Sequence, residues 1–569
     1  MAESHNLAEA SPANNHLLYY TSSESPLGKS RKGLWLSALF GVGIILVGNK
    51  GSLIVAGVIC VLLLMAFGAI EFSLRHKVAN REPAVVLRPD AIESRLFSGK
   101  TKQYEWSRIE AISIEGNQNG RLLRFRLTAS SLHPDRRAFW TGINPARPSL
   151  QLGSFEIATQ EKLYDEINSR LRLRGANGRA TECSENPITE ERTFQEQLRS
   201  FAPTPWITYL LIAANVAIWL ATLTAGASIA GTPTDKLLLW GGNAASEVQR
   251  GDWWRLVTAM FLHMGLMHVV MNMLGFASVG ITVERIYGHR LFLIIYLGSG
   301  LIGNALSLHF AAQQGVSVGA SGAVFGVMGA LLVGLYQHRD RLPKTFGSRT
   351  LSSLGFFISY SLLQGFSHQG IDNAAHVGGL LGGSLLAFVL PARFNIDRFA
   401  KVFRFRVLTA TVIAFVVLYG LVVTSPTAAV DQKQVVEGNV QFLKGVNEFR
   451  NVINVMQLDE KQVKDGTLTK HEVDDRSRKV FAPLLRSTLQ DLAHAYLPPS
   501  DPRSKVKADL TQITKLLLEL AEMPSVYRNG ASDPTPADPE RAAAIEAELK
   551  RVNRQLQEHT VEVKEKRKP

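Results

Sequence analysis

The segment GASG at positions 319–322 and the segment HVGGLLGG at positions 376–383 decide how this chain folds. Both lie within long apolar runs, where side chains would normally face lipid or another helix. An ionisable side chain inside a membrane span is costly and rare, so His376 is a candidate functional residue. Glycines at helix interfaces let two helices approach closely. Ser321 and His376 therefore predict a nucleophile–base pair, and with it hydrolysis inside a bilayer.

The composition indicates a membrane protein with soluble appendages. Mean hydropathy over the 569 residues is only +0.05, because very apolar blocks alternate with charged ones. The net charge of +13 could suggest nucleic-acid binding. Lysine and arginine, however, lie largely between the apolar runs, as in cytoplasmic loops of membrane proteins, so we expect no nucleic-acid partner. The two cysteines, Cys60 and Cys183, provide neither a disulfide framework nor a zinc cluster.

The region before the densest apolar block divides into four segments. Positions 1–32 are a polar tail without the features of a cleavable signal peptide. Two apolar runs within 33–75 predict a transmembrane hairpin, since each is near the minimum of roughly 17 residues for crossing a bilayer. Positions 82–174 are polar with strand character. Positions 175–203 are charged and lack apolar periodicity, so we interpret them as a linker.

The segment at 82–174 has the pattern of a small α+β domain. Apolar residues alternate with arginines in a period-two pattern typical of a half-buried strand; they are Leu123, Phe125 and Leu127. Thr159 then opens a predicted helix. Its apolar face carries Leu163, Ile167 and Leu171. Strands closed by one helix after a hairpin resemble the small bacterial PH-like domains, through the segments VLRPD at 86–90 and WSRI at 106–109. An unrelated small α+β domain fits the same pattern.

Seven further apolar runs predict a polytopic α-helical membrane core over positions 204–424. We place the spans at 206–223, 267–283, 291–311, 320–336, 351–366, 375–390 and 407–423. Positions 425–569 then turn polar and helical. In the last predicted helix Asp538 is the N-cap and Pro539 the first residue. Its apolar residues at helical spacing are Ile545, Leu549, Val552 and Leu556.

Charge in the connections predicts the orientation of the core. Basic connections alternate with others that are balanced or lack lysine and arginine. The basic ones are 284–290, 338–349 and 393–406; the others are 225–250, 312–318 and 367–373. The positive-inside bias places the basic set in the cytoplasm. The N-terminus and the 82–174 domain are then cytoplasmic, and the region after 425 lies outside. By analogy with PH-like hairpin proteins, we expect a bacterial inner membrane.

This topology brings four polar side chains together. Ser321 lies at the start of the fourth core span and His376 at the start of the sixth, and both spans run from outside to inside. The second span runs the same way, and its outer end carries His268 and Asn272. Their i, i+4 spacing puts both side chains on one helical face. The four residues therefore lie at a similar depth near the outer face of the membrane.

Over about 204–423 the chain resembles the rhomboid intramembrane serine proteases. The resemblance rests on short motifs that occur in the family's order, one in each expected element. They are Trp254-Arg255, the segment HVVMN at 268–272, Glu284, the segment GASG at 319–322, and His376 with Gly379 and Gly383. The resemblance implies a six-plus-one bundle of transmembrane helices. It also implies an endopeptidase that cleaves transmembrane protein substrates near the outer membrane boundary without metal or organic cofactor.

The resemblance also assigns roles to individual residues. It implies a dyad without an aspartate, in which Ser321 is the nucleophile and His376 the general base. The implied oxyanion site comprises the Asn272 amide, the His268 ring and the Ser321 backbone N–H. Phe325 occupies the place where the family braces the histidine with an aromatic ring. The remaining motif residues support the site by close helix packing or loop structure; they are Gly319, Gly322, Gly379, Gly383, Trp254, Arg255 and Glu284.

Other interpretations compete with this one. A lone serine in a span more often bonds a preceding carbonyl, and a lone histidine could line a transport path. A transporter or channel would carry polar residues through both leaflets, whereas here they stop in the outer one. An inactive rhomboid-like protein that escorts membrane clients would not need an intact Ser321 and His376. His263 lies outside the i, i+4 pair, so we interpret it as structural.

Other hydrolase motifs fit poorly. Position 323 is alanine, so the segment around Ser321 lacks the second glycine of the α/β-hydrolase elbow. His471-Glu472 is followed by Asp475, so the zinc-protease motif is absent from the sequence. We expect the appended regions to regulate or recruit. The apolar faces of the C-terminal helices would pack on one another, on the membrane, on a partner or on a second copy.

Overall fold

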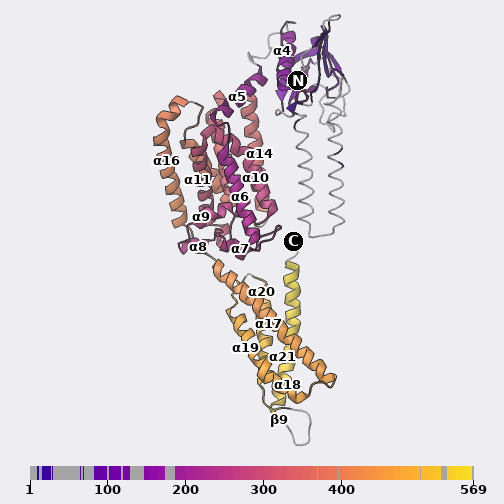
Figure 1. Ribbon diagram of the computed structural model, residues 1–569, viewed down its shortest axis with the longest axis vertical. Coiled ribbons are helices and arrows are strands. Elements are labelled where there is room, and N and C mark those ends of the chain that lie inside the picture. The colour runs from indigo at the N-terminus through magenta and orange to yellow at the C-terminus, as the bar shows by residue number, and fades with distance from the viewer. Residues whose placement is uncertain are drawn as a thin grey trace.

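A computed structural model of the chain describes residues 9–11, 16–22, 24–26, 29, 65, 68, 82–98, 101–116, 120–128, 147–173, 186–367, 370–394, 396–499, 501–526 and 535–566. A small α+β domain and a helical C-terminal region lie at opposite ends of a helical core (Figure 1). Apart from Met65 and Gly68, the predicted hairpin at 33–75 lies outside the described residues. Cys60 and Cys183 lie outside them too.

The small domain contains two antiparallel sheets. Its five-stranded sheet has the order β1 (Glu9–Ser11), β2 (His16–Tyr19), β3 (Val85–Leu87), β4 (Ala91–Ser94) and β5 (Gln103–Glu105). Strands β1 and β2 come from the predicted polar tail, so that prediction was wrong for this stretch. The segment HLLY of β2 pairs with β3, and Tyr19 is buried. This apolar run is too short to stand out in a polar context.

The second sheet and one helix complete the small domain. The sheet has the order β6 (Ile109–Glu115), β7 (Leu122–Leu127) and β8 (Ser149–Gln151). The predicted alternation is confirmed, because β7 buries Leu123, Phe125 and Leu127. Helix α4 (Ile157–Leu173) begins two residues before the predicted start and buries Leu163, Ile167 and Leu171, as expected. The resemblance to PH-like domains stays a prediction.

The predicted linker contains a helix that joins the small domain to the core. Helix α5 (Pro187–Phe201) is capped by Asn186, whose side chain accepts the Ile188 N–H at 2.9 Å. Ile188 packs in the small domain, whereas Phe194 and Leu198 pack in the helical core. Phe194, Leu198 and Phe201 follow the helical spacing i, i+4, i+7, which the sequence analysis overlooked among the many charged residues. The linker prediction was therefore wrong for this segment.

A helix lies at each of the seven predicted core runs. They are α6 (Trp206–Thr224), α10 (Leu266–Tyr287), α11 (His289–Ser307), α13 (Ser321–Gln337), α14 (Lys344–Ser367), α15 (Asn373–Val389) and α16 (Ile396–Val423). Helices α6, α10 and α11 and residues 399–423 of α16 are long and apolar enough to cross a membrane. Helices α13 and α15 are apolar but shorter. The connections contain the short helices α7 (Thr234–Leu239), α8 (Ala245–Gln249), α9 (Arg255–Thr258) and α12 (Ala311–Gln314).

Helices α13 and α15 touch backbone to backbone. A Cβ added to Gly379 would lie 1.9 Å from the carbonyl oxygen of Gly322, and one added to Gly383 would lie 2.0 Å from that of Gly326. Such distances are far inside van der Waals contact, so each position tolerates only glycine. Small residues at a helix interface permit this approach. The packing fixes the start of α13 against the start of α15.

The C-terminal region is a separate set of helices with its own apolar clusters. It contains α17 (Gln432–Lys464), α18 (Lys470–Arg476), α19 (Ala482–His494), α20 (Arg503–Glu522) and α21 (Pro539–Lys566). The predicted start of α21 is confirmed, because the Asp538 carboxylate accepts the Arg541 N–H at 2.9 Å. Ile545 and Val552 are fully buried. Leu549 and Leu556, the other two predicted apolar positions, are half-buried.

Candidate active site

Ser321 is the first residue of α13, and the turn before it depends on a glycine. Gly319 has φ +135°, a backbone conformation that residues with a side chain rarely adopt. Its N–H donates to the Ala259 carbonyl at 2.9 Å, which anchors the turn. A Cβ at Gly319 would also lie 2.9 Å from Cε1 of His268. The glycine therefore directs Ser321 into the helix start and leaves space for the His268 ring.

Ser321 and His376 lie at hydrogen-bond distance. Their Oγ and Nε2 atoms are 2.8 Å apart. His376 is buried, and within the described residues its Nδ1 has no hydrogen-bond partner. With Nε2 as the acceptor, the Ser321 hydroxyl donates the hydrogen bond. The predicted pair is therefore brought together, and in the described part of the chain no third side chain forms a hydrogen bond with the histidine ring.

Phe325 holds the histidine ring from one side. Its ring stacks on that of His376 with a centroid separation of 4.4 Å and an angle of 6° between the planes. Phe325 lies one turn after Ser321, so a single helix carries both the hydroxyl and the stacking ring. The placement agrees with the role that the resemblance assigns to Phe325.

Asp372 was missed by the sequence analysis, although it lies one turn before His376. Its Oδ1 accepts the Ala375 N–H at 2.9 Å and so caps α15. Its Oδ2 accepts hydrogen bonds from the hydroxyls of Ser317, at 2.5 Å, and Ser307. One carboxylate thus joins the end of α11, the connection before Ser321 and the start of α15. An aspartate just before an apolar helix is a recognised N-cap signal that could have identified it.

Two of the three expected oxyanion donors, His268 and Asn272, lie on α10. His268 lies against Gly319, as described above, and its Nδ1 accepts the Met264 N–H at 3.3 Å. The Asn272 side-chain amide donates to the His268 carbonyl at 2.9 Å. His263 is fully buried and packs edge-to-face on the His268 ring, with centroids 5.1 Å apart. His263 therefore supports the position of His268, a contact that sequence spacing did not reveal.

The other predicted motif residues make contacts that hold the local backbone in place. Arg255 donates through Nη1 to the Leu238 carbonyl at 2.6 Å and lies over the Trp254 ring at 4.7 Å. Glu284 is fully buried and accepts the backbone N–H groups of the first turn of α6, at 2.8 Å from Thr208. These residues fix the connection after α6 and the start of α6. They do not join the group around Ser321.

Apolar helices around a serine–histidine pair have the features of an intramembrane serine hydrolase. The family model described as the Rhomboid domain matches residues 250–393, a range that contains Trp254, His268, Ser321 and His376. The chain is also 32% identical over 199 residues to the putative rhomboid protease YdcA of Bacillus subtilis. The aligned region covers 34% of this chain and 92% of YdcA. The chain therefore belongs to the rhomboid family of intramembrane serine proteases.

Two further relatives are matched over a smaller share of their length. Rhomboid protease GluP of Bacillus subtilis is 39% identical over 186 residues, covering 33% of this chain and 35% of GluP. RHOMBOID-like protein 6, mitochondrial, of Arabidopsis thaliana is 44% identical over 143 residues, covering 25% of this chain and 45% of the relative. The chain thus spans less than half the length of these two proteins, and their likeness to it is confined to a quarter to a third of its residues.

Proposed function

We propose that this protein is an endopeptidase that cleaves transmembrane proteins near the outer membrane boundary with Ser321 and His376. The observation that carries the proposal is the 2.8 Å separation of Ser321 Oγ and His376 Nε2 between helices that are locked together by glycine. A serine hydroxyl is a weak nucleophile, so a base within hydrogen-bond reach must take its proton. His376 meets that condition.

The reaction proceeds by acyl transfer. Ser321 Oγ bonds to the carbonyl carbon of the scissile peptide while its proton passes to His376 Nε2. The tetrahedral intermediate then collapses, the C–N bond breaks, and His376 gives the proton to the leaving amine. Water, activated by His376, releases the acyl group from Ser321. These steps require no metal or organic cofactor, so chelators should leave the rate unchanged.

The oxyanion would be stabilised by three donors. Ser321 is the first residue of α13, and first-turn N–H groups have no acceptor within their helix. The His268 ring lies against the turn that precedes Ser321. The Asn272 amide, which now donates to the carbonyl one turn before it, would turn toward the oxyanion. Removal of one such donor costs about 3–4 kcal/mol in other enzymes.

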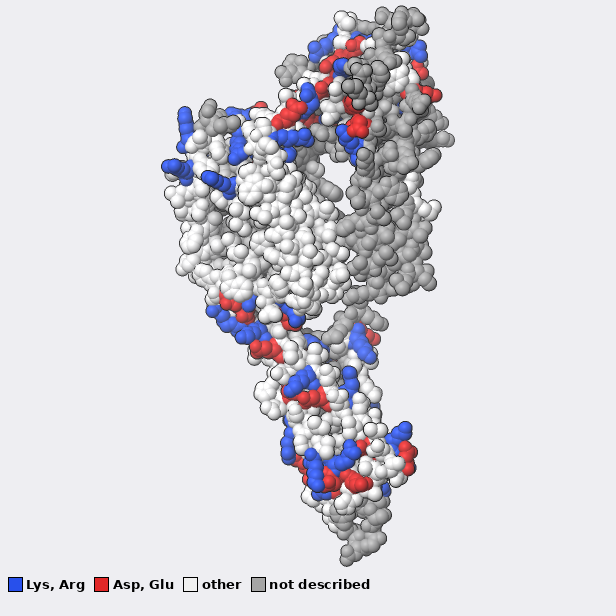
Figure 2. Space-filling view, in the orientation of Figure 1, with Lys and Arg blue, Asp and Glu red and all other residues white. Residues whose placement is uncertain are grey.

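The proposed topology is a six-plus-one bundle with the site near the outer face. Basic side chains gather at the end of the core next to the small domain, whereas acidic and basic side chains mix at the end that meets the C-terminal region (Figure 2). The positive-inside bias favours a cytoplasmic location for the first end. The small domain is then cytoplasmic and the C-terminal region outside. A bacterial inner membrane remains the proposed location.

The decisive experiment compares variants of the proposed active-site residues with a variant of a serine outside the site, all in purified enzyme. Ser321→Ala and His376→Ala should each abolish cleavage of a model transmembrane substrate, and Asn272→Ala should lose less because one donor among three is removed. Ser384→Ala is the matched control, because among the described residues the Ser384 hydroxyl donates only to the Leu380 carbonyl on its own helix, at 2.7 Å. Near-wild-type turnover by either dyad variant would refute the mechanism. Substrate binding without cleavage by the wild type would support the escort protein instead.

We propose that the appended regions select or recruit substrates. The C-terminal region contacts the outer connections of the core, where the side chains of Gln249 and Gln313 both donate to the Pro426 carbonyl. On that side it can meet the extramembrane part of a substrate. Deletion of residues 431–569 should slow cleavage of a full-length membrane protein and spare that of a short model substrate. Unchanged rates on both would leave the region a stabilising extension.

A further inference from the structure

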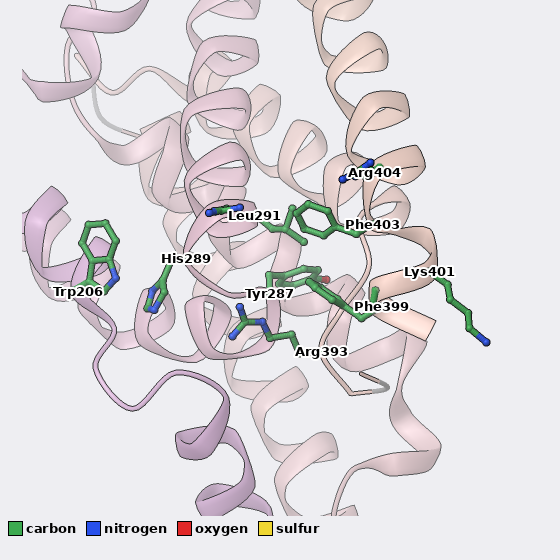
Figure 3. Close-up of a pocket in the computed structure, with 11 residues that line it drawn as sticks. Trp206, Tyr287, His289, Leu291, Arg393, Phe399, Lys401, Phe403 and Arg404 are labelled. Carbon is green, nitrogen blue, oxygen red and sulfur yellow. The ribbon is translucent and has the colours of Figure 1, made fainter. Parts of the chain in front are cut away.

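A cavity of about 540 Å³ lies at the end of the core that is opposite the C-terminal region. Its walls come from the start of α6, the end of α10, the start of α11 and the start of α16 (Figure 3). All four helix ends meet at one level, where the apolar spans give way to basic connections. The cavity is thus separate from Ser321 and His376, and the proposed reaction does not use it.

Four strong cations line the cavity. Arg393 is half-buried beside Tyr287, with its guanidinium turned toward His289 (Figure 3). Its Nη1 donates to the Phe201 carbonyl at 2.6 Å, and burial lowers the pKa of Arg393 below its ordinary value. Arg290 and Arg404 also line the cavity, and Lys401 lies at its edge and extends away.

The positive charge of the cavity is not balanced by carboxylates in the described residues. In that part of the chain Arg290, Lys401 and Arg404 form no ion pair. Glu284 is near, but it is fully buried and already accepts from the first turn of α6 and from His289, at 2.5 Å. The wall also includes the first turn of α11, and the N-terminal end of a helix carries partial positive charge. An anion would therefore be favoured here.

The other wall of the cavity is apolar. Leu291, Phe399 and Phe403 line it (Figure 3). Trp206 is half-exposed at the start of α6, and tryptophan is enriched at membrane–water interfaces. A cationic wall next to an apolar wall, at the level of the membrane boundary, matches a molecule with an anionic head and a hydrocarbon tail. Basic pockets between transmembrane helices on the cytoplasmic side bind lipid head groups in this way.

We propose that this cavity binds the phosphate of an anionic molecule, and that the molecule is an anionic phospholipid of the cytoplasmic leaflet. Arg393, Arg290 and Arg404 hold the phosphate, and the acyl chains lie along Leu291, Phe399 and Phe403. A bound lipid of this kind joins α6, α11 and α16, three helices whose ends otherwise meet around an open cavity. The site depends on the membrane location of the core and is independent of the proposed catalysis.

Native mass spectrometry of the full-length protein in detergent tests the proposal. Titration with phosphatidylglycerol should give a bound lipid with at least tenfold higher affinity than phosphatidylcholine. Each basic residue at a lipid surface contributes enough that its loss lowers affinity about fivefold, so Arg290→Gln with Arg404→Gln should lower it about 25-fold. Equal binding of the two lipids by the wild type would overturn the proposal.

A matched control distinguishes lipid binding in the cavity from general attraction of the lipid to basic residues on the surface. Arg199→Gln with Arg339→Gln removes the same charge from exposed arginines at the same end of the core, outside the cavity. This variant should change phosphatidylglycerol affinity less than twofold. Equal losses in both double variants would overturn the site. Circular dichroism and the melting temperature verify that both variants fold.

Inorganic phosphate distinguishes the two sources of the anion. Because the apolar wall contributes to lipid binding, phosphate at the same concentration should not displace phosphatidylglycerol. If inorganic phosphate binds as tightly, and the Arg290→Gln/Arg404→Gln variant loses that binding, then the phosphate site stands and its assignment to a lipid is wrong.

Discussion

Helices α13 and α15 in the core and helices α20 and α21 in the C-terminal region are both close pairs, but they are held together differently. The first pair meets at Gly322, Gly326, Gly379 and Gly383, where backbone touches backbone. The second pair contains no glycine and is flanked by ion pairs such as Arg541–Glu519, at 2.7 Å. In lipid, burial of apolar side chains contributes little to the association of two helices, so close backbone packing takes its place. In water, burial of leucine, isoleucine and valine side chains is sufficient to hold two helices together.

The difference also has a functional consequence. A pair separated by large side chains can adjust its spacing as those side chains change rotamer, whereas the α13–α15 pair is in backbone contact and has one fixed spacing. That spacing sets the 2.8 Å distance between Ser321 and His376. If the proposed dyad is catalytic, the glycines of this pair set its geometry as well as the packing.

We expect the largest loss of cleavage activity when the backbone contact between α13 and α15 is broken. Gly379→Ala would place a Cβ 1.9 Å from the Gly322 carbonyl oxygen, so α13 and α15 must separate. Overpacking typically costs about 1–3 kcal/mol and here should reach the upper end. We expect a clear fall in melting temperature and a loss of cleavage of at least about 100-fold, since a 1 Å misplacement of reacting groups can have that effect.

The same substitution elsewhere in the core provides the control for this prediction. Gly420 on α16 has open space around its Cβ position. Gly420→Ala should leave both the melting temperature and the cleavage rate within a factor of two of the wild type. A Gly379→Ala enzyme that cleaves as fast as Gly420→Ala would show that the α13–α15 spacing does not control the site.

The placement of the candidate site residues could be predicted where they lie on regular elements. Ser321, His376 and Phe325 each lie near the start of a helix whose apolar run is visible in the sequence. Asp372 and His263 were missed because their roles depend on contacts between elements distant in the chain. Asp372 binds Ser307 and Ser317, and His263 packs on His268, which no local pattern reveals.

The fold of the appended regions was less predictable for the same physical reason. Helix α5 buries Ile188 in one body and Phe194 in another, so its role as a connection between the two bodies depends on contacts that its local sequence does not reveal. Strand β2 joins a sheet whose next strand, β3, begins at Val85, more than sixty residues later in the sequence. By contrast, α21 presents one continuous apolar face with a strong N-cap, and both were recognised.

We expect a smaller loss of cleavage activity when the hydrogen bonds of Asp372 at the start of α15 are removed. Asp372→Ala deletes the cap of α15 and leaves the hydroxyls of Ser307 and Ser317 without their acceptor. Loss of an N-cap costs about 0.5–2 kcal/mol, and we expect cleavage to fall about tenfold as the start of α15 loosens. Asp372→Asn keeps an acceptor oxygen and should retain most of the activity. Equal loss in both variants would mean that the negative charge, and not the cap, matters.

We expect the smallest effect, a change in local stability, when the ion pair at the junction between the core and the C-terminal region is lost. Arg250 donates to the Asp431 carboxylate at 2.6 Å, and this hydrogen bond lowers the pKa of Asp431 below its ordinary value of 3.8. A carboxylate with a lowered folded-state pKa stabilises the fold above its unfolded-state pKa, and this contribution is lost as the pH falls through the folded-state pKa. Both side chains are partly exposed, so the contribution should be below about 1 kcal/mol.

Hydrogen exchange measures this contribution. Amides of the junction at 425–431 should exchange faster below about pH 4 than the intrinsic rates account for. Asp431→Asn should show the faster exchange already at pH 7 and no further change on acidification. A junction that stays equally protected in the wild type from pH 7 to pH 3 would show that the ion pair does not hold the two regions together.

Covalent labelling tests whether Ser321 and His376 form a reactive pair within the membrane core. The intact protein in detergent is treated with a fluorophosphonate, and the modified residue is mapped by mass spectrometry in wild-type and His376→Ala protein. We expect an adduct on Ser321 in the wild type, no adduct on Ser384, and loss of the Ser321 adduct in His376→Ala. An adduct on Ser321 that forms equally fast without His376, or wild-type protein labelled only at other serines, would contradict the proposed pair.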